Sequence, residues 1–356
     1  MQKMIFHGGG EPAGRRVSRC RDSSTQGLCP LRLGGGLVLA LFAAHAFSLT
    51  PLERNVQDSL SASFATASLL ADSDVIKFGI WDFNPNDILD SEDEGFGSDE
   101  STELRQSLRQ LSFPFRWQLS PEGESGKFAV LAKMAYLDVE REEQIFPSQS
   151  GKEDRIYQQV TSLGLGLGYQ KPLDAHWGIS LKGYATWMHY RNELDFNTPE
   201  SRLFEPFLED VIANIDIDLV MFEPIAGLHY GWRKRATEYR LFTDYHYIKG
   251  EPIEVDNPAH HLRPEAWYWS NGFRVKRNLA GSWEGHSLWF RLSRIDMGGD
   301  LTGQLGANHY YEAGVAWLID APESWSMVSN LGVGINLNYG SDLRGGTLIF
   351  LYNFDG

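Results

Sequence analysis

Cysteine is nearly absent from this chain of 356 residues, because only Cys20 and Cys29 occur and both lie within the first 46 residues. If that segment is removed, the remaining chain has no disulfide framework, thiol nucleophile or cysteine-ligated metal site. No HExxH motif is present, and the adjacent His260 and His261 point apart in an extended segment. We therefore expect no metal site, no cofactor and no catalytic residues.

Basic residues are also in short supply. The chain has 32 Lys and Arg against 47 Asp and Glu, which gives a formal net charge of −15. Nucleic-acid binding requires a basic surface, so this balance argues against a nucleic-acid partner. The low mean hydropathy of −0.32 does not exclude a membrane protein. A transmembrane β-barrel alternates lipid-facing with water-facing residues, and its average therefore stays moderate.

The N-terminus has the pattern of a targeting segment. Residues 1–32 are basic, an apolar run follows, and Ala44-His45-Ala46 forms an A-x-A cleavage pattern. We predict a cleaved signal peptide at residues 1–46, a helical segment at 47–73 and an outer-membrane β-barrel at 74–356. The alternative is an uncleaved membrane anchor, although the apolar run at 33–49 is short for a membrane span.

Apolar residues alternate with polar or small residues through most of the chain after residue 74, which is typical of β-strands. Leu163, Leu165, Leu167 and Tyr169 share one face, for example. We predict twelve strands, at residues 74–83, 109–119, 127–138, 156–170, 176–190, 215–232, 237–248, 265–276, 284–295, 307–320, 327–339 and 346–354.

The connections between these strands alternate between long and short almost to the end of the chain. Transmembrane barrels have short periplasmic turns and longer extracellular loops. Aromatic residues near the predicted strand ends suit the girdles of such a barrel; these are Tyr169, Trp187, Trp232, Trp317 and Tyr339. The pattern predicts an all-β fold, a twelve-stranded antiparallel transmembrane β-barrel. A soluble all-β domain is the alternative.

The segment before the barrel breaks the strand pattern and predicts a helix. Thr50 suits an N-cap, Pro51 the first helical position and Glu53 a capping box. An apolar stripe recurs every four residues, made of Leu52, Val56, Leu60 and Phe64. We predict that this helix plugs the barrel lumen; a periplasmic tail, a surface helix or an extra strand are the alternatives.

Small residues on the inward face suggest a seat for that helix, because glycine in a strand often marks a close approach of another backbone. These residues are Gly164, Gly166, Gly168, Gly314, Gly332 and Gly334. Ile349 and Leu351 also point inward, where the apolar stripe would cover them.

Two of the long connections carry patterns of their own. An acidic stretch, residues 87–103, lies in the first and predicts a solvated, flexible loop; divalent cations that bridge it to lipopolysaccharide are the alternative. In the third, Leu203, Phe207 and Val211 predict a short helix that folds over the pore mouth or packs on the loops. If Ile215, Ile217 and Leu219 face lipid, the following polar residues face inward: Asn214, Asp216 and Asp218.

The chain ends on a strand with large apolar residues at alternate positions, among them Phe350, Tyr352 and Phe354. This ending resembles the signal by which outer-membrane barrels are handed to their assembly machinery. Together with the signal peptide, the short helix and the twelve strands, it resembles an autotransporter translocator domain that lacks a passenger. The chain is thus similar to the solitary outer-membrane autotransporter-like β-barrel family of Gram-negative bacteria.

The resemblance covers residues 50–356 and implies no biochemical activity. It implies a monomer in the outer membrane whose partners are lipid, lipopolysaccharide and the barrel-assembly machinery. We therefore expect a barrel with its lumen filled by its own helix and with no enzymatic activity. An open small-solute channel is one alternative. A surface hydrolase using His246 near Asp244 or His286 near Glu284 is another.

Overall fold

The computed structural model describes residues 51–72, 81–89, 93–121, 125–147, 150–322, 325 and 328–352. The predicted signal peptide at 1–46, most of the predicted strand at 74–83, and Phe354 lie outside these residues. Everything that follows concerns the compact unit that begins at Leu49.

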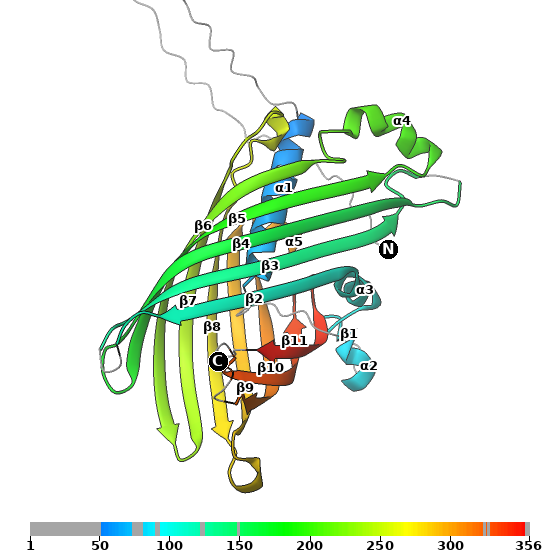
Figure 1. The fold of residues 1–356 in the computed structure, drawn as a ribbon. Coiled ribbons are helices and arrows are strands. Elements are labelled where there is room, and N and C mark those ends of the chain that lie inside the picture. Colours follow the sequence, from blue (N-terminus) through cyan, green and yellow to red (C-terminus); the bar gives the residue numbers. More distant parts are fainter. Residues whose placement is uncertain are drawn as a thin grey trace, which may run out of the picture. The chain divides into compact units, whose positions relative to one another are not determined.

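The twelve predicted strands are present and form one antiparallel sheet in the order β1-β12-β11-β10-β9-β8-β7-β6-β5-β4-β3-β2 (Figure 1). The all-β prediction is therefore confirmed. The strands are β1 (Trp81–Phe83), β2 (Leu108–Gln118), β3 (Lys127–Glu143), β4 (Asp154–Pro172), β5 (Trp177–Asp195), β6 (Asp216–Lys234), β7 (Thr237–Pro252), β8 (Glu265–Asn278), β9 (His286–Gly299), β10 (His309–Asp320), β11 (Asn330–Tyr339) and β12 (Gly345–Tyr352).

The described residues also form seven helices. They are α1 (Pro51–Leu70), α2 (Pro85–Leu89), α3 (Asp99–Ser107), α4 (Pro199–Leu208), η1 (Pro258–His260), η2 (Gly281–Trp283) and α5 (Leu301–Gln304). Among the residues described, no helix has both the length and the apolar character of a membrane span.

The outward face of the sheet is apolar where lipid is predicted. On β4, Leu163, Leu165 and Leu167 are exposed, whereas Gly164 between the first two and Gly168 after the last are buried. Aromatic rings gather at the short-turn end, where Trp232 stacks on Tyr239 with ring centroids 5.1 Å apart. Such rings suit the interface between hydrocarbon and headgroups.

Several strands are longer than a membrane crossing requires. β4, β5 and β6 have 19 residues each, whereas a tilted membrane strand needs about 9–11. On β4 the outward side chains are apolar up to Leu163 and polar beyond it, at Thr161, Gln159 and Arg155. On β5 the change comes between Trp187 and His189, and His189 is the registered partner of Thr161.

Polar and charged side chains pair with one another on the outer face of these strands, near the long connections. Arg155 Nε lies 2.8 Å from Glu140 Oε1, and His189 Nδ1 lies 3.1 Å from Asp218 Oδ1. Charged side chains of this kind belong in water rather than hydrocarbon. The upper parts of β3–β6 therefore form a wall that rises above the lipid-facing belt, and we call it the raised wall.

The raised wall corrects the predicted orientation at the start of β6. Ile215, Ile217 and Leu219 are buried on the inner side, and Asn214, Asp216 and Asp218 lie on the exposed side. The prediction assumed lipid along the whole outer face. Above the belt the outer solvent is water, so polar residues point outward and apolar residues pack inward.

The strand ladder leaves a seam between its two ends. Among the described residues β1 pairs with β12, and no pairing between β1 and β2 is present. α3 spans this position. Its Arg105 is only 1% exposed, donates from Nε to Asp82 Oδ1 of β1 at 3.0 Å, and donates from Nη1 to the Leu343 carbonyl at 2.7 Å.

This buried pair gives the first prediction. Replacing Arg105 with Ala leaves the Asp82 carboxylate buried without its cation, which typically costs about 3–5 kcal/mol. We expect a correspondingly lower free energy of unfolding in urea titrations of the protein in micelles, followed by tryptophan fluorescence. Arg191→Ala is the control, because its partner Glu193 is exposed and such pairs contribute about 0–1 kcal/mol. Equal losses in the two variants would contradict a structural role for the seam pair.

Candidate functional site

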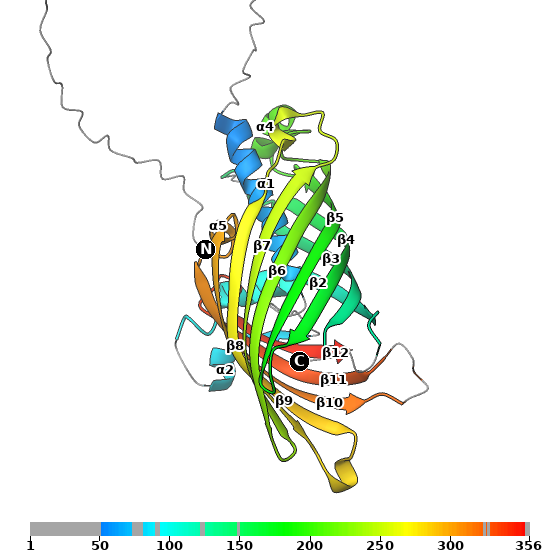
Figure 2. The same cartoon turned by 90° about the vertical axis from the view of Figure 1, so that its left-hand side faces the viewer.

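The inside of the barrel is occupied by α1, which Figures 1 and 2 show enclosed by the curved sheet. Of the predicted stripe, Val56, Leu60 and Phe64 are buried in the main apolar core, and the side chain of Leu52 lies outside the described residues. The ring of Phe64 is fully buried and lies 5.7 Å from the ring of Tyr190 on β5. The inner face of the raised wall supplies the rest of this contact, with Val160, Met188, Ile215 and Ile217.

The first half of α1 is held at the long-loop end. Gln57 Nε2 donates to the carbonyl of Pro258 in η1 at 2.7 Å. Leu301 of α5, and Leu305 and Leu262 nearby, belong to the same core as the helix stripe. The chain therefore enters the lumen from the end that carries the long connections.

The last turn of α1 is tied to the opposite part of the wall. The Leu70 carbonyl accepts a hydrogen bond from Gln110 Nε2, and the Ala71 carbonyl accepts one from Ser112 Oγ at 3.1 Å. Helix ends leave their final carbonyls without intrahelical partners, and β2 supplies partners here. The helix is thus fixed at both ends.

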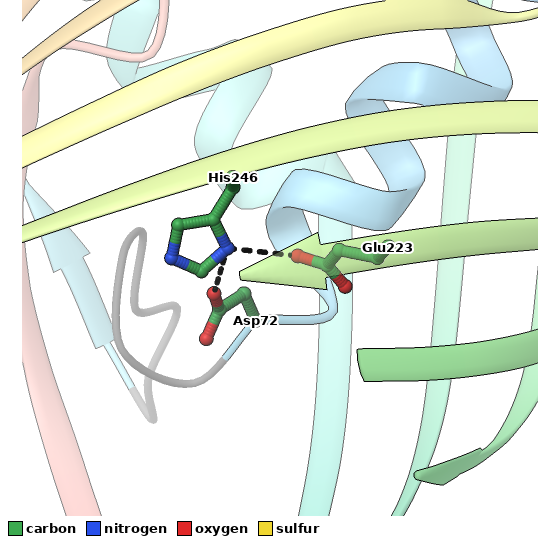
Figure 3. A group of neighbouring side chains, drawn as sticks. All are labelled: Asp72, Glu223 and His246. Atoms are coloured by element: carbon green, nitrogen blue, oxygen red, sulfur yellow. Dashed lines mark hydrogen bonds and ion pairs between the residues drawn. The ribbon is translucent and has the colours of Figure 1, made fainter. Parts of the chain in front are cut away.

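Directly after the helix, Asp72 joins a group of polar and charged side chains in the lumen, three of which, Asp72, Glu223 and His246, are drawn in Figure 3. His246 Nδ1 lies 2.9 Å from Glu223 Oε1 and 3.7 Å from Asp72 Oδ2. Lys133 Nζ lies 2.7 Å from Glu223 Oε2, and the Tyr268 hydroxyl donates to Asp72 Oδ2 at 2.6 Å. We call these five residues the lumen cluster.

The lumen cluster draws on five different parts of the chain. Asp72 follows α1, Lys133 is on β3, Glu223 on β6, His246 on β7 and Tyr268 on β8. A local break in the β6–β7 ladder accompanies Glu223, because registered pairing skips from Phe222 to Ile225 across Pro224, which has no backbone N–H.

Sequence reasoning missed this cluster. His246 was considered only beside Asp244, and neither Asp72 nor Glu223 was singled out. One signal was available, since Glu223 interrupts an apolar run at an inward position, and an ionisable residue within a membrane strand is costly unless it is paired. The partners themselves cannot be identified from the sequence, because they are brought together only by the curvature of the wall.

The cluster has donor atoms that suit a metal ion. One atom each from Asp72, Glu223 and His246 lies within 4.8 Å of the other two, and carboxylate with imidazole is a common zinc set. However, the Lys133 ammonium binds the second oxygen of Glu223, and the single Tyr268 hydroxyl proton is directed at Asp72, with Glu223 Oε1 also within hydrogen-bond distance at 3.2 Å. Protein cations and protons therefore already fill the role that a metal would take, and the arrangement fits a latch between helix and wall.

The six inward glycines lie on the inner face, but their nearest neighbours belong to the wall and not to α1. A β-carbon on Gly164 would stand 2.8 Å from Lys133 Cγ and from Thr186 Oγ1. The others would first meet side chains or carbonyls of adjacent strands; they are Gly166, Gly168, Gly314, Gly332 and Gly334. The glycines thus make room for large inward side chains of the barrel rather than a seat for the helix.

The helix does not cover the end of the last strand either. Ile349 and Leu351 are buried in a separate cluster with Trp289, Ala316 and Leu318. The reason is that α1 ends at Leu70 and is anchored to β2, away from that group. Phe350 points outward and is exposed, whereas the side chain of Tyr352 and all of Phe354 lie outside the described residues.

The second histidine named in the hydrolase alternative has a different environment. His286 stacks on Trp317 with ring centroids 5.4 Å apart and meets Trp283 edge-on at 5.3 Å. It is therefore part of the aromatic belt at the short-turn end. The structure does not bring His246 and His286 together into one site.

The lumen cluster gives the second prediction. Lys133→Met leaves Glu223 buried without its ammonium partner, so we expect a loss of about 3–5 kcal/mol in the free energy of unfolding, measured in micelles as above. The double variant Lys133→Met/Glu223→Gln removes both charges and should recover most of that loss. If the double variant is as unstable as the single one, the cation is not compensating Glu223.

Solved structures similar to this chain include the translocator domain of the autotransporter NalP from Neisseria meningitidis, with 13% identity, coverage of 69% of this chain and 82% of that one, and a TM-score of 0.42. The β-domain of the Bordetella autotransporter BrkA matches with 10% identity, 69% and 87% coverage and a TM-score of 0.40. The transport unit of the autotransporter AIDA-I from Escherichia coli matches with 12% identity, coverage of 84% of this chain and 99% of that one, and a TM-score of 0.35.

No curated protein matches the chain. The model of one protein family does, the solitary outer membrane autotransporter beta-barrel domain, over residues 61–354, which is almost the whole barrel together with the second half of α1. On that match, the chain belongs to the family of solitary outer-membrane autotransporter β-barrels.

Proposed function

We infer that this protein is a closed barrel of the Gram-negative outer membrane, sealed against solutes by its own α1. The observation that supports this most directly is the burial of the Val56, Leu60 and Phe64 stripe in the same core as the wall. The two helix-end anchors and the lumen cluster add fixed polar contacts. Because several separate contacts hold the helix, breaking any one of them does not release it from the lumen.

The alternatives gain no specific support. An open channel requires residues 47–73 to stay outside the pore, whereas α1 packs in the core. The family consists of translocator-type barrels, and we extend this to propose that the chain has no catalytic site. Lipid, lipopolysaccharide and the barrel-assembly machinery are its proposed partners, with Phe350, Tyr352 and Phe354 as the assembly signal and a monomer as its state.

Planar-bilayer conductance tests the plug. Wild-type protein should insert and conduct little, and deletion of residues 50–72 should raise the single-channel conductance sharply because the lumen loses its helix. The variant Phe64→Ala keeps the helix but removes a fully buried ring, which typically costs about 3–5 kcal/mol, and should produce intermittent openings.

Circular dichroism of each variant in liposomes checks that the strands still form. Leu163→Ala, a lipid-facing change of similar kind, is the control and should conduct like the wild type. Wild-type conductance already as high as that of the deletion would contradict the proposal in favour of an open channel.

We also propose that the mature chain begins at Phe47, after cleavage behind Ala44-His45-Ala46. Intact-mass measurement of protein purified from outer membranes should show the loss of residues 1–46. Ala44→Asp/Ala46→Asp should block cleavage, because the site needs small side chains, whereas His45→Ser should not. Recovery of the full-length chain from wild-type cells would instead indicate an uncleaved anchor.

A further inference from the structure

Helix α4 presents large apolar side chains to solvent. Leu203 is 74% exposed and Phe207 is 70% exposed. Phe204 is 46% exposed and stacks on Phe146 of the preceding long connection, with ring centroids 4.5 Å apart. Contiguous exposed apolar side chains of this size usually mark an interaction site.

The helix is firmly mounted rather than loosely placed. The buried Asp154 carboxylate accepts the backbone N–H groups of Asn197 at 2.7 Å and Thr198 at 2.9 Å, and the Ser201 hydroxyl at 2.7 Å. Thr198 Oγ1 in turn caps the Ser201 N–H at 3.1 Å. On the underside, Leu208 packs against an apolar cluster made of Leu194, Phe196 and Ala213. The exposed face is therefore held in one orientation.

Membrane lipid is not positioned to cover this face. α4 follows the end of β5 on the raised wall, beside the tips of β4 and β5 in Figure 1. Between α4 and the apolar belt, β5 exposes Arg191 and Glu193. Hydrocarbon that reached Leu203 would also have to cover these charged groups, which is strongly unfavourable.

The charge around the apolar face selects among the remaining partners. Within residues 199–210 there are four acidic residues, Glu200, Glu205, Glu209 and Asp210, which we call the acidic rim, against one basic residue, Arg202. A second copy of this chain would bring two acidic rims together, and the phosphates of lipopolysaccharide carry the same sign. A partner with Lys or Arg beside its apolar residues complements both features of the surface.

We propose that α4 is a docking site on the cell-surface side for a cationic amphipathic segment of another protein, with Leu203 and Phe207 as the apolar anchors. Phe204 and Phe146 form the floor beside them, and the acidic rim sets the charge preference. Apolar anchors of an amphipathic helix against a hydrophobic surface are a common recognition mode. This inference is independent of whether the lumen is sealed.

The test uses the full-length barrel in phosphatidylcholine nanodiscs and two fluorescent helical peptides. The peptides share the same leucines, and one carries lysines where the other carries glutamates. We expect the lysine peptide to bind, to bind at least tenfold more weakly to Leu203→Ser/Phe207→Ser, and to weaken as salt is raised. The glutamate peptide is the charge control. Nanodiscs that lack the barrel, mixed with the lysine peptide, are the blank.

The matched control variant is Ile253→Ser, which replaces an exposed apolar residue on another long connection and should bind the lysine peptide as the wild type does. Equal binding by wild type and the Leu203→Ser/Phe207→Ser variant overturns the proposal. So does equal binding of both peptides. Sedimentation of the protein without peptide tests whether a second copy of the chain binds this face. Self-association of the wild type that is lost in the Leu203→Ser/Phe207→Ser variant would assign the face to a second copy and overturn the proposal.

Discussion

Backbone N–H and C=O groups in hydrocarbon have no water to bond, so each must find a partner within the protein. The antiparallel ladder from β2 through β12 to β1 meets that requirement for most of the wall. Where the ladder is interrupted between β1 and β2, side chains of α3 donate to two backbone carbonyls, Arg105 Nη1 to that of Leu343 and Gln106 Nε2 to that of Asp82. The same need recurs at the end of α1, whose last carbonyls accept hydrogen bonds from side chains of β2. The arrangement of the strands and of α1 therefore depends on a hydrogen-bond partner for each backbone polar group.

A second constraint comes from the change of solvent along single strands. The lower part of β4 meets lipid and the upper part meets water, and the residues pointing outward change from Leu163 to Thr161 accordingly. On β5 the inner face changes in the opposite sense, because Met188 and Tyr190 share the apolar core of α1 whereas the inward Thr186 and Ser180 below them are polar. One strand therefore follows two opposite patterning rules, divided at the edge of the apolar belt.

The lumen shows how charge is accommodated inside such a barrel. Glu223 is buried, yet Lys133, His246 and Tyr268 lie within hydrogen-bond distance of its carboxylate. Asp72 joins the same cluster from the end of the helix, so the plug and the wall share a single set of partners. Buried ion pairs contribute little net stability but are costly to break, which suits a contact that fixes position.

Period-two alternation, the loop lengths and the capping residues at 50–53 were sufficient to predict the twelve strands and the helix, because these signals are local. The family resemblance followed from the same features. Local patterns also placed Val56, Leu60 and Phe64 on one helix stripe, which is the stripe that the structure buries.

Three features were decided only by the tertiary structure. The sequence predicts that the inward glycines seat the helix, but atoms of the wall occupy the space beside them. The path of α1 depends instead on its hydrogen bonds to Pro258, Gln110 and Ser112. Asp216 and Asp218 were assigned to the wrong face, because a sequence does not state where the membrane ends. The lumen cluster escaped prediction because its members are distant in sequence and become neighbours only when the wall curves around the helix. The sequence by itself determined the elements and their periodicity, and the curvature of the sheet decided which side chains meet and which solvent each one faces.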